Sequence, residues 1–310
     1  MKLRFWGVRG SIPSPGPRTA RYGGNTTCIE VGTDDGTLII LDAGTGIFAL
    51  AQHLLARLPV RANIFITHSH WDHIHGLPFF TPLFNAGSEV RLYGALDPVS
   101  GRGIEHVLGV QLQNSYFPVG EAQMAATIDY RTLALGEAVA VGDAIVGNVV
   151  MNHPVTNLGY RIDCNGRSLF FTGDHEPFCN PYAPGDARHA ACQRDIDARE
   201  HAIERAMQGV DALIVDSSYT LDEYPAKQGW GHGTLDSALA LAIRVGAGTL
   251  YLTHHEPTRG DDDLEAAFAD LLARHQPLPA GLKVVLAYEG LEVEISRRVA
   301  ATSPAPALLK

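Results

Sequence analysis

Paired cysteines are missing from this sequence, whose four cysteines are scattered at Cys28, Cys164, Cys179 and Cys192. Because none of them forms a CxxC pair, neither a zinc ribbon nor a disulfide framework is indicated. Long apolar runs are missing as well: no stretch reaches membrane-spanning length, and the amino terminus lacks the apolar segment of a signal peptide. These absences predict a soluble protein of the reducing cytoplasm.

Basic residues are scarce. The chain has 24 Lys and Arg against 34 Asp and Glu, and its longest basic run is the pair Arg297-Arg298. The net negative charge repels polyphosphates at long range, so a nucleic-acid partner would need a local basic patch. The composition therefore disfavours nucleic acid as a partner without eliminating it.

Internal repeats and long linkers are also missing, which favours a single domain. With 310 residues, of which 45% are hydrophobic, the chain can bury a large core. We expect one domain over residues 1–296 and a flexible tail over residues 297–310, where Ser303-Pro304-Ala305-Pro306-Ala307 has the composition of a frayed end.

The order of apolar patterns predicts an α/β fold. Short β-rich runs separated by Gly, Pro and Asp fill the first half, at residues 3–8, 27–31, 38–41 and 63–67. Helical and strand patterns alternate in the last third: helix within 186–208, strand 212–215, helix 235–245, strand 249–253 and helix 262–274. Such alternation is typical of layered α/β proteins.

A dense group of histidines follows the apolar strand Ile64-Phe65-Ile66, in the run Thr67-His68-Ser69-His70-Trp71-Asp72-His73. Imidazole and carboxylate groups are the ligands that suit zinc and related divalent ions. His68 and His70 stand two apart at a strand end, so their side chains project to the same side and can share one ion. Asp72 and His73 can then face a neighbouring ion.

Three more candidate ligands lie where other predicted strands end. They are His153 after Val150-Met151-Asn152, Asp174 after Phe171-Thr172-Gly173, and His254 after Leu252-Thr253. Each alone is a weak signal, but α/β proteins assemble their sites from separated strand ends.

These motifs together resemble the metallo-β-lactamase superfamily. The order HxHxDH, then His, then Gly-Asp, then Thr-His is similar to that family over about residues 1–296. The segments 5–11 (FWGVRGS), 23–26 (GGNT) and 41–46 (LDAGTG) resemble its phosphodiesterase branch, which includes ribonuclease Z and the carbon-phosphorus-pathway cyclic phosphodiesterase. The resemblance implies an α/β fold, a four-layer αββα sandwich with two metals at one edge.

The resemblance also implies how the ligands divide. One metal would take His68, His70 and His153, the other would take Asp72, His73 and His254, and Asp174 would bridge them. The cofactors would be two divalent ions, for which zinc fits the ligand set and manganese or iron are also acceptable. Asp72 would in addition orient or deprotonate the attacking water.

A proton donor for the leaving group is predicted in the glycine-rich run 229–234 (GWGHGT). His232 is the candidate, with Asp216 or Asp222 as the carboxylate that would keep it protonated. The run resembles the Gly-His-Ser-Thr element of the phosphodiesterase branch, with Gly233 in place of the usual serine.

Substrate contacts are predicted at Arg9, Asn25 and Arg161, as candidates to bind an anion. The segment 10–24, rich in glycine and proline, is interpreted either as a loop that faces the substrate or as a plain connection between strands.

The predicted function is a metal-dependent phosphodiesterase that cleaves a small or cyclic phosphodiester. One alternative is a tRNA 3′-end endonuclease like ribonuclease Z, although the long glycine-proline-rich arm of many such enzymes is not evident. Others are a β-lactam or thioester hydrolase on the same scaffold, and a non-catalytic binding protein that metals stabilise. A homodimer is compatible with the sequence.

Overall fold

The computed structural model describes residues 1–297. The tail predicted over residues 297–310 therefore lies almost wholly outside the described residues, and the single domain over residues 1–296 stays a prediction. Within the described residues, no helix is long and apolar enough to cross a membrane.

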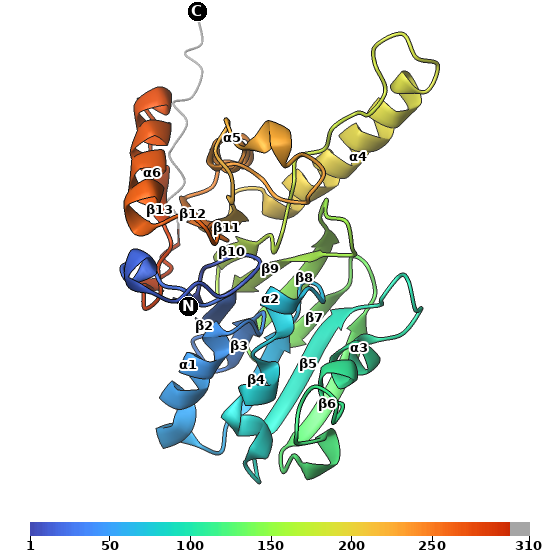
Figure 1. Ribbon diagram of the computed structural model, residues 1–310, viewed down its shortest axis with the longest axis vertical. Helices are drawn as coiled ribbons and strands as arrows, with labels where there is room; N and C mark the ends of the chain where they lie inside the picture. The colour runs from blue at the N-terminus through green and yellow to red at the C-terminus, as the bar shows by residue number, and fades with distance from the viewer. Residues whose placement is uncertain (298–310) are drawn as a thin grey trace, which may run out of the picture.

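Two seven-stranded mixed sheets form the centre of the fold (Figure 1). The first has the order β14-β1-β2-β3-β4-β5-β6, with β14 (Glu292–Glu294), β1 (Lys2–Gly7), β2 (Cys28–Gly32), β3 (Leu38–Leu41), β4 (Arg61–Phe65), β5 (Glu89–Ala95) and β6 (Thr127–Leu133). The second has the order β13-β12-β11-β10-β9-β8-β7, with β13 (Lys283–Leu286), β12 (Thr249–Thr253), β11 (Ala212–Asp216), β10 (Arg167–Phe171), β9 (Leu158–Cys164), β8 (Ala144–Val150) and β7 (Ala138–Val141).

Helices cover the outer faces of both sheets (Figure 1). The first sheet carries α1 (Gly46–Leu54), α2 (Trp71–Ile74) and α3 (Ile104–Gln111), and the second carries α4 (His189–Met207), α5 (Leu235–Val245) and α6 (Asp261–His275). Short 3-10 helices lie in the connections: η1 (Pro17–Thr19), η2 (Leu55–Arg57), η3 (Leu77–Phe79), η4 (Thr81–Phe84), η5 (Glu121–Gln123) and η6 (Tyr224–Ala226). The predicted four-layer αββα sandwich is confirmed.

Strand β3 shows why the sandwich forms. Its four residues are all buried, and they alternate between two cores: Ile39 and Leu41 pack between the sheets, whereas Leu38 and Ile40 pack under α1. Alternate side chains point to opposite faces, so an apolar run without polar interruption predicts burial on both faces. Helix α5 closes the far side through Leu235, Leu239 and Ala242.

Parallel pairing places the candidate site at one edge of the sandwich. Strands β3 to β6 are mutually parallel, as are β10 to β13. The segments that follow β4, β10, β11 and β12 therefore leave their sheets at carboxyl ends, where α/β proteins assemble binding sites. The turn between the antiparallel strands β8 and β9 joins them there.

Candidate metal centre

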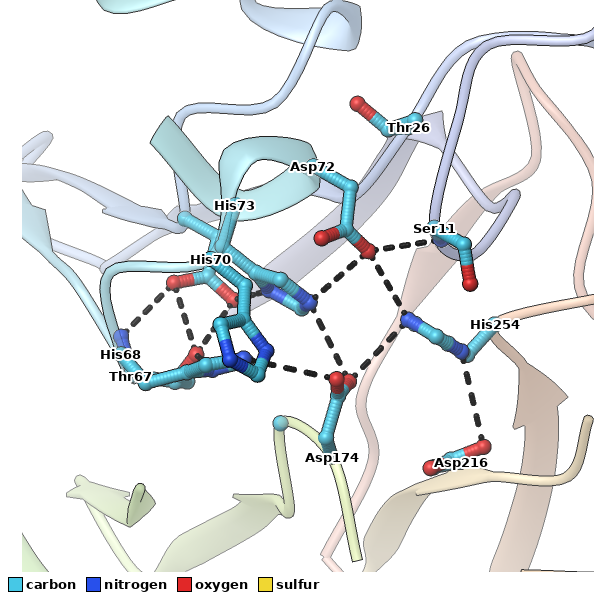
Figure 2. Close-up of polar contacts among 12 residues, drawn as sticks. Ser11, Thr26, Thr67, His68, His70, Asp72, His73, Asp174, Asp216 and His254 are labelled. Atoms are coloured by element: carbon cyan, nitrogen blue, oxygen red, sulfur yellow. Dashed lines mark hydrogen bonds and ion pairs between the residues drawn. The ribbon is translucent and has the colours of Figure 1, made fainter. Parts of the chain in front are cut away.

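The structure brings all seven predicted ligands together. Figure 2 labels His68, His70, Asp72, His73, Asp174 and His254. Donor atoms of one group lie within 4.8 Å of one another and come from His68, His70, His153 and Asp174. A second group, within the same limit, comes from Asp72, His73, Asp174 and His254. The two groups share Asp174, as the resemblance implied.

Asp174 faces both groups with different oxygens. Its Oδ2 lies 3.4 Å from Nε2 of His68, whereas its Oδ1 lies 3.1 Å from Nε2 of both His73 and His254. Figure 2 shows the carboxylate between the two sets of imidazoles. One buried carboxylate with an oxygen directed to each group has the geometry of a bridging ligand.

The outward-facing nitrogens of the imidazoles are occupied by hydrogen bonds. His73 Nδ1 donates to Asp42 Oδ2 at 2.7 Å, and His68 Nδ1 lies 3.1 Å from the hydroxyl of Thr67, which itself donates to Asp42. Such partners fix the tautomer that leaves the Nε2 lone pair free to bind a metal.

Three buried atoms at the centre have no hydrogen bond within the described residues: Nε2 of His68, Nε2 of His73 and Oδ1 of Asp174. Buried polar atoms are normally paired, so three converging orphans of ligand type point to an absent binding partner. A set of neutral imidazoles and carboxylates within bonding reach of two points fits two divalent cations.

The local field also favours cations. Burial opposes the charged form of His73, yet the carboxylates of Asp174 and Asp72 raise the pKa of this imidazole well above its usual value. For His68, burial and the neighbouring His73 outweigh Asp174 and lower the pKa. Carboxylates that hold extra positive charge on one buried imidazole would hold a divalent cation equally well.

Asp72 is positioned from outside the histidine cluster. The backbone N–H of Ser11 donates to its Oδ2 at 2.8 Å, and the same oxygen lies 3.1 Å from His254 Nε2 (Figure 2). The amino-terminal loop therefore reaches the centre through Ser11.

His232 lies beside this centre, paired with a buried carboxylate. Its Nδ1 is 2.8 Å from Asp216 Oδ2 and 3.8 Å from Asp174 Oδ2. Burial lowers its pKa, but Asp216 and Asp174 prevail and raise the pKa to about 9. The sequence left Asp216 and Asp222 open as partners, and the structure selects Asp216.

Asp216 serves as an acceptor for this histidine. Its carboxylate is fully buried and also accepts hydrogen bonds from the backbone N–H and hydroxyl of Ser218 and from the N–H of His175. Asp216, His232, Asp174 and His254 form a third group of close donor atoms. Because the oxygens of Asp216 are committed to these donors, we interpret the pair as a proton donor and its carboxylate.

Glu176 holds the glycine-rich loop that carries His232. Its buried carboxylate accepts from the hydroxyl of Tyr224 and from the N–H groups of Gly229 and Gly231, at 2.7 to 2.8 Å. The Gly231 carbonyl in turn accepts from His153 Nδ1 at 2.9 Å. The sequence suggested only a supporting or loop role for Glu176, since no local pattern connects it to a loop some fifty residues later.

Gly231 itself cannot be replaced without strain. Its φ of +92° lies in the region that favours glycine, and a Cβ there would lie 2.2 Å from His153 Nδ1. The close contact between this loop and a predicted ligand therefore needs a glycine.

The side chains predicted to contact substrate are engaged within the protein. Arg9 is fully buried; its guanidinium donates to the carbonyls of Gly23, Glu256 and Arg259 and pairs with Asp261. It has no surface left for a substrate and holds the loops together instead.

The two other predicted contacts are also committed to the protein. The side-chain amide and the backbone N–H of Asn25 both donate to Glu289. Arg161 pairs with Asp163 and donates to the carbonyl of Ala206 at the end of α4, so its guanidinium is engaged away from the ligands. Residue type alone does not reveal that the fold engages these side chains in its own hydrogen bonds and ion pairs.

The segment 10–24 docks on α6. Arg18 and Arg21 pair with Asp263 and Asp262 in the first turn of that helix. Ser11 at its start contacts Asp72, so only this end of the loop reaches the centre.

Comparisons with known proteins agree with this geometry. A family model described as a beta-lactamase superfamily domain matches residues 37–255. Ribonuclease Z of Haloarcula marismortui is 26% identical, over 94% of this chain and 96% of its own length, and ribonuclease Z of Pyrobaculum arsenaticum is 27% identical, over 90% and 91%.

Solved structures share the fold. The metallo-beta-lactamase fold protein YhfI from Bacillus subtilis matches with a TM-score of 0.64 at 16% identity, over 94% of this chain and 98% of its own. The short form of human tRNase Z matches with a TM-score of 0.63 at 18% identity, over 96% and 100%. Because the family model matches more than half of the sequence, the chain belongs to the metallo-β-lactamase superfamily, and it is a metallo-hydrolase.

Proposed function

We propose that this protein is a phosphodiesterase that hydrolyses a small or cyclic phosphodiester with two divalent ions, preferably zinc. The observation that carries the proposal is the buried pair of His232 and Asp216, 3.8 Å from the carboxylate that bridges both ligand groups. Thioester hydrolysis expels a weakly basic thiolate and has less need of this donor, whereas an alkoxide that leaves phosphorus is a strong base.

The ligands divide into two sets around Asp174. His68, His70 and His153 would hold one ion, and Asp72, His73 and His254 would hold the other. Two ions held in this way would supply a water of lowered pKa and positive charge beside the phosphate oxygens.

The chain contributes the remaining proton transfers. The Nδ1–H of His232 donates to Asp216, so its Nε2–H is free to give a proton to the leaving oxygen. On the opposite side, Asp72 can accept a proton from the attacking water or orient it through its second oxygen.

A tRNA 3′-end endonuclease is the second candidate, because the curated relatives that cover most of the chain are ribonuclease Z proteins. The charges weigh against it. The net charge is −10, and Arg18 and Arg21 near the amino-terminal loop are paired with aspartates of α6. Binding a long polyanion would need unpaired basic residues at the rim.

The test is a zinc titration of the metal-stripped full chain with bis(p-nitrophenyl) phosphate as substrate. We expect turnover that rises until two ions are bound per chain, as measured by elemental analysis. The variant His70→Ala should bind one ion fewer and lose most activity. The exposed His106 on α3 provides the matched control, His106→Ala.

Absence of turnover at two bound ions would contradict the phosphodiesterase proposal. A precursor-tRNA cleavage assay on the same preparation separates the two candidates, since only the endonuclease would cut it at the 3′ end of the tRNA.

A further inference from the structure

Three large apolar side chains are exposed beside the metal centre. Ile12, Trp71 and Trp230 are 60%, 61% and 57% exposed. Each is next in the chain to a residue of the site. Ile12 follows Ser11, whose N–H donates to Asp72, and Trp71 stands between His70 and Asp72. Trp230 precedes Gly231, whose carbonyl accepts from His153. They come from three separate segments, each of which also supplies a residue of the site.

The two tryptophans each adjoin, along the chain, a residue in contact with His153. Trp71 follows His70, whose Nδ1 lies 3.1 Å from His153 Nε2, and the other nitrogen of His153 contacts the Gly231 carbonyl at 2.9 Å. Trp230 precedes Gly231. The two indoles are therefore attached at opposite ends of the same short chain of contacts across the first ligand group.

Lys227 packs on one of them. Its ammonium lies 4.1 Å from the ring centroid of Trp230, and within the described residues it forms no ion pair. A cation over an indole face restrains the ring and keeps a positive charge near it. In a chain of net charge −10, this places an unpaired cation beside an exposed aromatic ring next to the centre.

Exposed tryptophan is costly for solubility, and apolar rims around polar sites mark ligand surfaces. An indole offers a flat face on which planar rings stack with little selectivity between them. We propose that Trp71 and Trp230 are specificity-determining residues that stack on a planar aromatic group of the substrate. The enzyme then prefers nucleoside phosphodiesters over aliphatic or sugar phosphodiesters; this preference rests on the proposed phosphodiesterase function.

A binding experiment tests the proposed role of Trp71 and Trp230 without catalysis. The third tryptophan, Trp6, is buried, so ligand-induced changes in indole fluorescence report mainly on Trp71 and Trp230. Adenosine monophosphate, a monoester, should quench the indole fluorescence of the zinc-loaded full chain. Ribose 5-phosphate should change this fluorescence only at higher concentration. Followed by calorimetry, the affinity ratio between these two ligands should fall about tenfold in Trp71→Leu and Trp230→Leu, a change of about 1.4 kcal/mol.

A kinetic experiment measures the corresponding preference between two phosphodiester substrates. The ratio of kcat/KM for a dinucleoside monophosphate to that for glycerophosphoethanolamine should fall about tenfold in each leucine variant and recover in Trp71→Phe and Trp230→Phe. Tyr116→Leu is the matched control, because Tyr116 is 65% exposed but lies between α3 and η5. A purely structural role would lower both activities together and leave the ratio unchanged.

The nucleobase could belong to a small diester or to the end of an RNA. Parallel assays with the dinucleotide and with a precursor tRNA identify which carries it. Equal affinities for the two monoesters, or ratios unchanged by both leucine variants, would overturn the inference. If no phosphodiester is hydrolysed, the proposed function fails, while the binding experiment still tests whether Trp71 and Trp230 stack on a nucleobase.

Discussion

The role of His232 can be tested by the basicity of the leaving group. In His232→Ala the donor disappears while Asp216 keeps its contacts with Ser218 and His175. Cleavage of a dinucleoside monophosphate expels an alkoxide, which needs a proton. Cleavage of bis(p-nitrophenyl) phosphate expels p-nitrophenolate, a weak base that leaves without one.

The magnitude follows from the environment of the imidazole. General acid catalysis contributes about 10² to 10⁴-fold in rate. His232 is only 12% exposed, and its hydrogen bond to the buried carboxylate of Asp216 raises its pKa and favours the protonated form, so water replaces it poorly. We expect kcat on the dinucleotide to fall at least about 100-fold, and kcat on the aryl ester less than about tenfold.

Steady-state kinetics on both substrates, with two zinc ions verified per chain, measures this difference. His106→Ala controls for loss of an imidazole elsewhere on the surface. Equal losses on the two substrates would refute the reasoning, because they would indicate that His232 supports the centre and does not protonate the leaving group.

Four further outcomes are expected. Glu176→Gln should lower the free energy of unfolding by about 1 to 3 kcal/mol in urea denaturation, because an amide cannot accept from all three donors that the carboxylate satisfies; an unchanged value would contradict the anchoring role. Arg9→Ala should lower the free energy of unfolding by about 3 kcal/mol or more, since it leaves the buried Asp261 without its ion-pair partner. A loss of substrate affinity with unchanged stability would instead support the predicted substrate contact. Removal of metal with EDTA should lower the melting temperature by several degrees, reversed by zinc, because ions that bind only the folded state stabilise it; an unchanged melting temperature would argue against a buried site. Hydrogen bonds from Thr33 and Thr37 lower the pKa of Asp35 to about 2. The stability that this carboxylate contributes is therefore present above its unfolded pKa of about 3.9 and is lost as the pH falls toward 2. The melting temperatures of Asp35→Asn and wild type should differ at pH 7 and converge as the pH falls over that range.

Several strands at the sheet edges escaped prediction. β6 and β14 interleave apolar with polar residues, and the apolar runs of β7 and β13 span only four and three residues, so these partly exposed strands lack the patterns that identify the buried strands. Their places are set by pairing with neighbours: β14, for example, pairs with β1 some 290 residues earlier. Pairing of this kind depends on the assembled sheet more than on local preference.

The run from His68 to His73 was predictable because its information is local. An apolar strand, a turn and ligand types two residues apart dictate that these side chains meet at one strand end. Predicted strand ends then supplied the distant candidates, the family resemblance divided the ligands between two metals, and the fold brings each of them to the same edge. To that extent the sequence by itself determined the fold and the kind of centre.

Only the tertiary structure decided which polar side chains are engaged in hydrogen bonds and ion pairs within the protein. Arg9 and Arg161 look like anion contacts in the sequence, yet both are held by carboxylates and carbonyls of the protein. The sequence could not choose between Asp216 and Asp222, nor connect Glu176 with the glycine-rich loop, whereas in the structure Asp216 holds the proposed donor and Glu176 holds its loop. The physical reason is that a hydrogen bond is formed by proximity in space, and proximity between distant segments arises only when the two sheets pack.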